Sequence, residues 1–206
     1  MTAVRISSGE SVDWVANPDA MLEDIRSVRG VNHCNGRGSS TAAARGYNIE
    51  RLATAVLDVD GYFIRFPGEK TCIDTTVLDD NYDRVSIESK GAVNRYPSGG
   101  YGEFRIWRQN HKRLCIDSIE HSEKSHIYFF VTYAVDDNGY AKEVGKLSVD
   151  VEVIDDLLTS WRWVDHASMS KARVRDISWH LLLSRLGVSV DRFRDNDMIV
   201  VNSESN

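Results

Sequence analysis

Glu88 and Lys90 stand two residues apart in the segment RVSIESK. This segment alternates apolar and polar residues, which predicts a β-strand with both charges on one face. A carboxylate can hold a divalent metal ion, and a neighbouring ammonium can orient a water molecule or stabilise developing negative charge. The pair therefore offers groups that phosphodiester hydrolysis uses. The same spacing also fits a solvent-facing strand edge with a cross-strand ion pair.

Two further carboxylates precede this pair. Asp74 lies fourteen residues before Glu88, after a predicted strand, and Glu50 lies near the exposed margin of a predicted helix. The turn between the two strands offers three rivals to Asp74, namely Asp79, Asp80 and Asp83. The types and positions of these residues indicate a polar site around Glu88.

The hydrophobic pattern from Thr41 onward predicts the elements that must position these groups. Apolar residues from Ile49 to Leu57 follow helical spacing, and Gly61 ends this helix. Aromatic and β-branched runs then predict strands at 62–66, 71–78 and 84–90. Residues 94–102 are rich in Pro and Gly and predict a loop, and a stripe from Phe104 to Cys115 predicts a second helix. A strand at 126–135 should follow and return through a hairpin to 146–154.

Outside this region the patterns predict a short helix at 18–29, helices at 155–163 and 173–187, and an edge strand at 198–201. We expect an α/β protein in three parts. Residues 1–40 form an N-terminal extension, 41–154 the core, and 155–206 a C-terminal helical extension packed on that core.

These motifs, in this order, resemble the PD-(D/E)xK nucleases, and within them the archaeal-type Holliday-junction resolvases. The resemblance covers residues 43 to 135. It begins with a helix carrying Arg45-Gly46 and Glu50, and continues with the aromatic strand GYFIRFPG and with Asp74 in CIDTT. It then includes Glu88-Ser89-Lys90 and a following helix in which Gln109 matches a Gln near the family's site.

The resemblance implies a restriction-endonuclease-like core, a central mixed β-sheet flanked by helices in the order α-β-β-β-α-β. It also implies cleavage of DNA with one or two Mg²⁺ ions, for which Mn²⁺ would substitute. By matched position, Asp74 and Glu88 would bind the metal directly, and Glu50 would bind it through water or complete a second site. Lys90 would hold the attacking water or stabilise the charge of the transition state, and Gln109 would position a phosphate or support Lys90. Junction resolution would require a homodimer, because it needs two symmetric cuts.

Two other functions remain open at this stage. The first is a restriction-type or repair endonuclease of the same superfamily, in which the C-terminal Trp161, Trp163 and Trp179 would read DNA, although Trp at helical spacing is more often core. The second is a DNA-binding protein with this fold and no catalytic activity. Binding without cleavage, unchanged by magnesium, would identify it.

The net charge of −6 argues against indiscriminate nucleic-acid binding, so any DNA site must be local. Positive charge does gather in two groups, although such runs are more often solvated faces. The groups are Arg105, Arg108, Lys112 and Arg113 with His111, and Lys171, Arg173 and Arg175.

The three cysteines, Cys34, Cys72 and Cys115, lack a CxxC pair and predict reduced thiols. His33 and Cys34 are adjacent, but no second pair with zinc spacing follows. Without an apolar run of membrane-spanning length or a secretory pattern, we expect a soluble cytoplasmic protein that binds no membrane.

Overall fold

The computed structural model describes residues 3–7, 11–15, 62–65, 75–78, 84–135, 141–166, 170–195 and 198–203. The predicted helices at 18–29 and 49–57 lie outside these residues. Among the described helices, none is long and apolar enough to cross a membrane.

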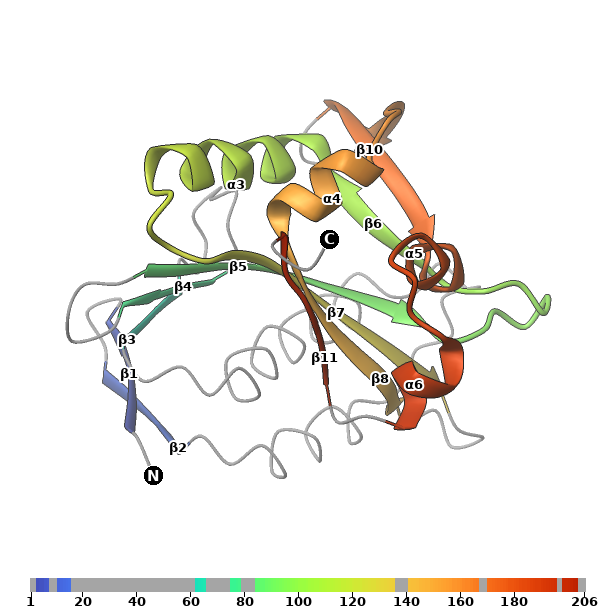
Figure 1. The fold of residues 1–206 in the computed structure, drawn as a ribbon, viewed down its shortest axis with the longest axis horizontal. Helices are drawn as coiled ribbons and strands as arrows, with labels where there is room; N and C mark the ends of the chain where they lie inside the picture. The colour runs from blue at the N-terminus through green and yellow to red at the C-terminus, as the bar shows by residue number, and fades with distance from the viewer. Residues whose placement is uncertain are drawn as a thin grey trace.

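A mixed six-stranded sheet forms the centre of the described structure (Figure 1). Its strands are β3 (Tyr62–Arg65), β4 (Thr75–Leu78), β5 (Arg84–Val93), β7 (His126–Val135), β8 (Ala141–Asp150) and β11 (Ile199–Val201). They lie in the order β11-β8-β7-β5-β4-β3, with β5 parallel to β7 and β8 antiparallel to β7. The three predicted strands, the hairpin and the edge strand are thus confirmed as elements.

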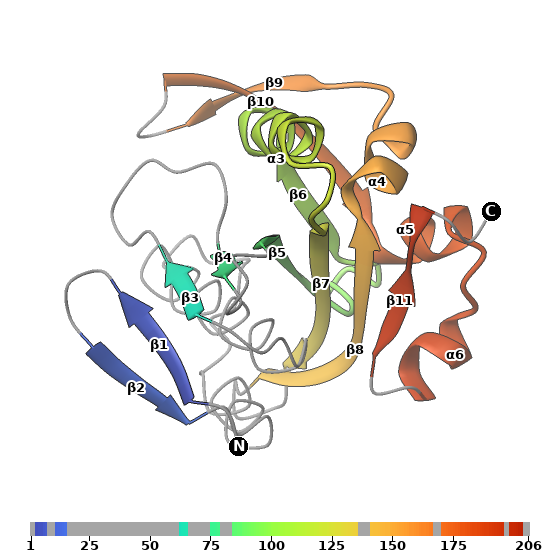
Figure 2. The same cartoon turned by 60° about the vertical axis from the view of Figure 1, so that its left-hand side comes forward.

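A second, antiparallel sheet contains β6 (Glu103–Trp107), β9 (Arg162–His166) and β10 (Ser170–Ser178), with β10 in the middle. Near the N-terminus, β1 (Ala3–Ser7) pairs with β2 (Ser11–Val15). The helices are α3 (Arg108–Glu120), α4 (Val151–Leu157), α5 (Trp179–Arg185) and α6 (Val190–Asp195). Figure 2 shows the second sheet beside α3, away from β1 and β2.

The predicted helix from Phe104 begins later than expected. Residues 103–107 form β6, in which Phe104 and Ile106 are buried and their neighbours are not. This alternation arises because β6 pairs with β10, placing Phe104 opposite Ile177. Helical conformation starts only at Arg108. The prediction failed because its strand partner lies about seventy residues away in the sequence.

Three predictions for the C-terminal part were also wrong in part. The helix expected at 155–163 ends at Leu157, and Arg162–His166 is strand β9. The helix expected at 173–187 is helical only over Trp179–Arg185, because the preceding residues pair with β6 and β9 as β10. The return strand expected to reach residue 154 ends at Asp150, and buried Val151 and Ile154 then follow helical spacing.

Gly187 follows α5 as predicted, with a φ of 67° that favours glycine. Because β9, β10 and β11 lie in it, the segment from residue 155 contains strands as well as helices. The division of the chain into extension, core and extension stays a prediction.

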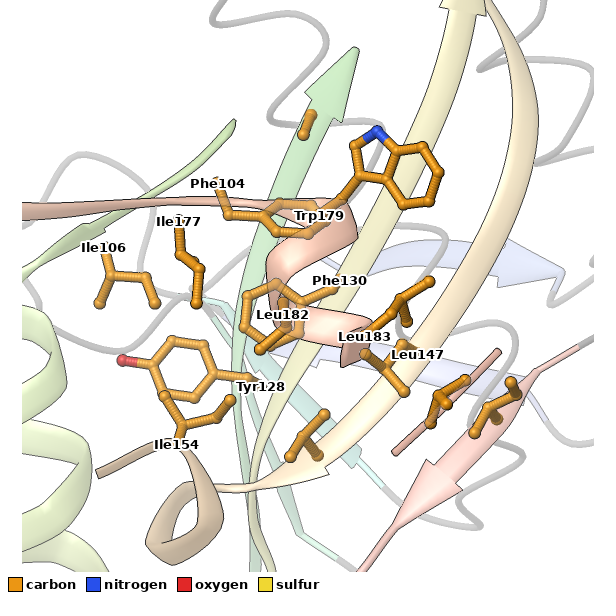
Figure 3. Packing of buried hydrophobic residues seen from close by; sticks show 14 of the residues in the cluster. Phe104, Ile106, Tyr128, Phe130, Leu147, Ile154, Ile177, Trp179, Leu182 and Leu183 are labelled. Atoms are coloured by element: carbon orange, nitrogen blue, oxygen red, sulfur yellow. The ribbon is translucent and has the colours of Figure 1, made fainter. Parts of the chain in front are cut away.

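The hydrophobic core lies between the central sheet and a layer made by the second sheet and the four helices (Figure 3). Phe130 of β7 contacts Phe104 of β6, with ring centroids 4.7 Å apart. Trp179 at the start of α5 is fully buried, and its indole nitrogen donates a hydrogen bond to the Asn94 carbonyl. These contacts fix β6 and α5 on one face of the sheet, so the layer that carries α3 is held in place.

The loop at 94–102 connects β5 to β6 and is a closed turn. Arg95 and Tyr101 form a bridge across it, and the Arg95 guanidinium lies 4.3 Å from the Tyr101 ring centroid. A Cβ at Gly102 would lie 1.7 Å from the Val93 carbonyl oxygen, so the close approach of these strands requires glycine. The loop lies at the opposite end of β6 from α3. A role for it in contacting DNA stays a prediction.

Asp176 joins all three strands of the second sheet. Its carboxylate accepts hydrogen bonds from Arg105 of β6, 2.8 Å away, and from Arg162 of β9. Burial acts to raise the pKa of Asp176, but the hydrogen bonds and charges of the two arginines outweigh it and hold the pKa below its usual value. The ion pair therefore favours the folded, ionised form.

We expect Asp176→Asn to lower the free energy of unfolding by about 1 kcal/mol at pH 7. Because the folded-state pKa is lowered, this contribution is complete above the ordinary Asp value of about 4 and is lost as pH falls through the folded value. Urea unfolding at pH 7 and pH 3 would measure it, with exposed Asp156→Asn as the control. An equal loss at both pH values would contradict the assignment.

Candidate functional site

Glu88 and Lys90 lie on one face of β5, as the sequence predicted, but this strand is not a solvent-facing edge. Counted from the edge strand β3, β5 is the third strand of the sheet, and Glu88 is 0% exposed. Lys90 Nζ donates to Glu88 Oε1 and, at 3.0 Å, to the carbonyl of Ser89. Removing two charges from water is costly, so a buried pair of this kind is weak evidence for a stabilising role. Its placement instead favours a functional one.

Helix α3 reaches this face of β5 at two points. Asn110 Nδ2 donates to Glu88 Oε1 over 2.9 Å, and Ser86 Oγ donates to Asp117 Oδ2 over 2.8 Å. Ser86 and Glu88 share a face because they are two residues apart on a strand, and Asn110 and Asp117 share a face because they are seven apart on a helix. The two periodicities therefore hold the helix in register with the strand.

Asp117 also binds the start of β7. His126 Nε2 donates to Asp117 Oδ2 over 3.0 Å, and both side chains are buried. One carboxylate thereby connects β5, α3 and β7. These buried contacts of Asp117 hold α3, the helix that carries Asn110, against β5 and β7.

Asn110, which was not among the predicted site residues, makes the contact with Glu88. Gln109 is exposed on the same turn and lines an adjacent cleft. A sequence signal for Asn110 did exist, since it lies four residues before the apolar Leu114 and so on the buried face of α3. The catalytic role of Gln109 stays a prediction.

Glu50 and Asp74, the other two predicted metal ligands, lie outside the described residues, as do the rivals Asp79, Asp80 and Asp83. The described part of β4 begins at Thr75, which pairs with Ile87. The residue that follows Asp74 is thus opposite the residue that precedes Glu88. The pairing of Asp74 with Glu88 as metal ligands stays a prediction.

A cleft of about 470 Å³ lies between the first turns of α3 and the strands β9 and β10. Asn110 lines the cleft and also donates the hydrogen bond to Glu88, so the cleft lies next to the Glu88 carboxylate. The other lining residues are mainly cationic or aromatic: Trp107, Arg108, Gln109, Lys112, Trp163, Lys171, Ala172 and Arg173. Members of both basic groups noted in the sequence therefore meet here, Arg108 and Lys112 from one and Lys171 and Arg173 from the other.

A second cluster of residues whose types can bind metal lies between α3 and α4. His111, Cys115 and Asp155 offer ligand atoms within 4.8 Å of one another. His111 already uses both ring nitrogens, with Tyr128 Oη at 3.0 Å and Asp155 Oδ1 at 2.9 Å. Burial, with the charges of Asp155 and Glu152, raises the pKa of the Cys115 thiol to about 12, so it stays protonated. The cluster acts as a polar link between α3, β7 and α4.

The Asp117 contacts generate a stability prediction. We expect Asp117→Ala to lower the free energy of unfolding by about 2–4 kcal/mol, because two buried donors lose their acceptor. Chemical denaturation would measure the change. Glu120→Ala, an exposed acidic position on the same helix, is the matched control and should change stability by less than about 0.5 kcal/mol. Similar losses in both variants would argue against the proposed link.

The chain was also compared with known proteins. A family model described as a PD-(D/E)XK nuclease superfamily domain matches residues 36–184. Comparisons with curated proteins and with solved structures gave no match. The matched range includes the Glu-Ser-Lys strand, α3, the cleft and both strands of the β9–β10 hairpin. Because it spans well over half of the sequence, this chain belongs to the PD-(D/E)XK nuclease superfamily.

Proposed function

We propose that this protein is a magnesium-dependent DNA endonuclease whose active site lies on the α3-facing side of β5. Membership of the superfamily implies a nuclease that hydrolyses phosphodiester bonds. The observation that carries the proposal is the buried Glu88 carboxylate, held by Lys90 and Asn110 beside a cationic cleft. Such a cleft offers a place for the phosphates of a nucleic acid.

The donor chemistry of Glu88 fits a magnesium ion, because Mg²⁺ prefers hard oxygen ligands and binds through one or two carboxylates. We propose Asp74 as the second direct ligand, and Glu50 as a ligand through water or at a second site. A bound ion would polarise the scissile phosphate and make a bound water molecule more acidic.

Lys90 supplies the positive charge of the site. Its ammonium contacts Glu88, and the side chain is only 13% exposed, so the charge is held beside the carboxylate. From there it can orient the attacking water or stabilise the charge that develops on the phosphate. We propose that Gln109, on the cleft side of the same helix turn as Asn110, positions a phosphate.

The preferred substrate under this proposal is branched DNA, with the four-way junction as the expected case. The order of motifs over residues 43–135, which resembles the archaeal-type resolvases, supports this choice. Two symmetric cuts require two active sites, so we propose a homodimer as the active form. A restriction-type or repair nuclease that cuts duplex DNA is the alternative within the superfamily.

Cleavage of labelled four-way-junction, duplex and single-stranded DNA, with magnesium or with a chelator, tests this proposal. We expect magnesium-dependent cutting, and at least about 100-fold slower cutting by Glu88→Gln and Lys90→Ala, because each variant loses a charge at the reacting phosphate. Arg113→Ala, an exposed cation of α3 outside the cleft, should cut at the wild-type rate.

The substrate that is cut decides the subtype. Symmetric cutting of the junction supports a resolvase, and preferential cutting of duplex replaces it with a restriction-type or repair nuclease. Folded protein that binds DNA but cuts none of the three substrates at any magnesium concentration would overturn the enzymatic proposal.

Asn110 provides a finer test of the site geometry. We expect Asn110→Ala to raise the magnesium concentration for half-maximal cleavage about tenfold, because hydrogen bonds to a metal ligand tune metal affinity. Gln109→Ala should instead raise the KM for DNA and leave the magnesium requirement unchanged. If the two variants exchange these effects, the assignment of their roles is wrong.

A further inference from the structure

The cleft between α3 and the β9–β10 strands concentrates positive charge on a protein that is negative overall. Four of its lining residues are cationic, and among the described residues that line it none is acidic. The whole chain carries a net charge of −6. A local field of this sign, set into an acidic surface, indicates that the cleft receives an anion with several charges.

The cations reach the cleft from two separate elements. Arg108 and Lys112 are four residues apart and therefore share a face of α3. Lys171 and Arg173 are two residues apart and share a face of β10. Both pairs line the cleft, one from the helix and one from strand β10, so a chain of phosphates passing between α3 and β10 can contact both.

Trp163 of β9 is the second unusual feature of the cleft. Its side chain is 60% exposed, whereas the large aromatic residues of the core are fully buried. Arg173 lies directly opposite Trp163 in the β9–β10 register, and its guanidinium is 4.5 Å from the indole ring centroid. This cation–π contact holds the indole in place beside the cations.

An exposed indole among cations matches the chemistry of an unpaired nucleotide. A flat aromatic ring stacks on a base of any sequence while lysine and arginine bind the adjoining phosphates. In a duplex the faces of the bases are already stacked on one another, so only the phosphates remain available to this surface.

We propose that this cleft binds an unpaired stretch of DNA, with a base on Trp163 and the flanking phosphates on Arg108, Lys112, Lys171 and Arg173. The binding site does not depend on the proposed function; only its consequence for cleavage rests on that function. Because Asn110 lines the cleft and donates to Glu88, the unpaired stretch leads directly to the Glu88–Lys90 pair. The substrate class of the nuclease is then DNA with unpaired nucleotides beside the bond that is cut, such as a branch point that has opened.

Binding measured without metal tests this inference separately from catalysis. Fluorescence anisotropy in a chelator would compare labelled oligo-dT of about 12 nucleotides, within the site sizes of single-strand grooves, with duplex DNA of the same length. We expect Trp163→Ala to weaken oligo-dT binding about tenfold and duplex binding less than twofold, and Trp163→Phe to restore most of the loss.

The charge contribution has its own matched pair. Lys112→Ala should reduce the dependence of oligo-dT affinity on salt by about 0.7 in the log–log slope, because it removes one phosphate contact. Arg113→Ala removes the neighbouring charge outside the cleft and should leave the slope unchanged.

Unchanged oligo-dT binding by Trp163→Ala, or an equal loss for single strand and duplex, would overturn the inference. Neither result depends on cleavage. An inactive protein that still shows the Trp163 effect would keep the single-strand site and refute only the nuclease.

Discussion

The packing of α3 against β5 in one register is the constraint on which the candidate site depends. Two hydrogen bonds, from Asn110 to Glu88 and from Ser86 to Asp117, join positions that repeat every two residues on a strand and every seven on a helix. A helix turns by about 100° per residue, so a shift of one residue would break both contacts. The same packing brings the first turn of α3 to the β9–β10 strands, where the cleft forms. The candidate site and the cleft therefore both depend on the position of α3 on β5.

The sequence was informative where structure is set locally. The strands at 62–65, 75–78, 84–93 and 126–135 have β-branched and aromatic residues in short runs bounded by turns, and they were predicted close to their observed bounds. The shared face of Glu88 and Lys90 follows from strand geometry alone. These features suffice to order the motifs, and the family model matches a range, residues 36–184, that includes these strands.

The rest depended on strand pairings that periodicity does not reveal. β6 pairs with β10, which lies far along the chain, and β9 pairs with its sequence neighbour β10; all three strands carry apolar spacing that also fits a helix. Gln109 was singled out because it matches a Gln near the family's site, whereas Asn110, which contacts Glu88, was not among the predicted residues. Periodicity could not show which of the C-terminal tryptophans are buried: Trp179 lies in the core, and Trp163 is exposed in the cleft.

The edge strand β11 has a consequence for how the chain is made. It pairs in parallel with Leu147–Val149 of β8, and it leaves the ribosome after the other five strands of the central sheet. Until then this stretch of β8 presents unpaired backbone groups that can pair with a second nascent chain. Synthesis thus passes through a stage in which β5, the strand of the candidate site, is already present while one edge of its sheet is still open. For such a protein, slow translation of the segment that contains β11 prolongs exposure to aggregation.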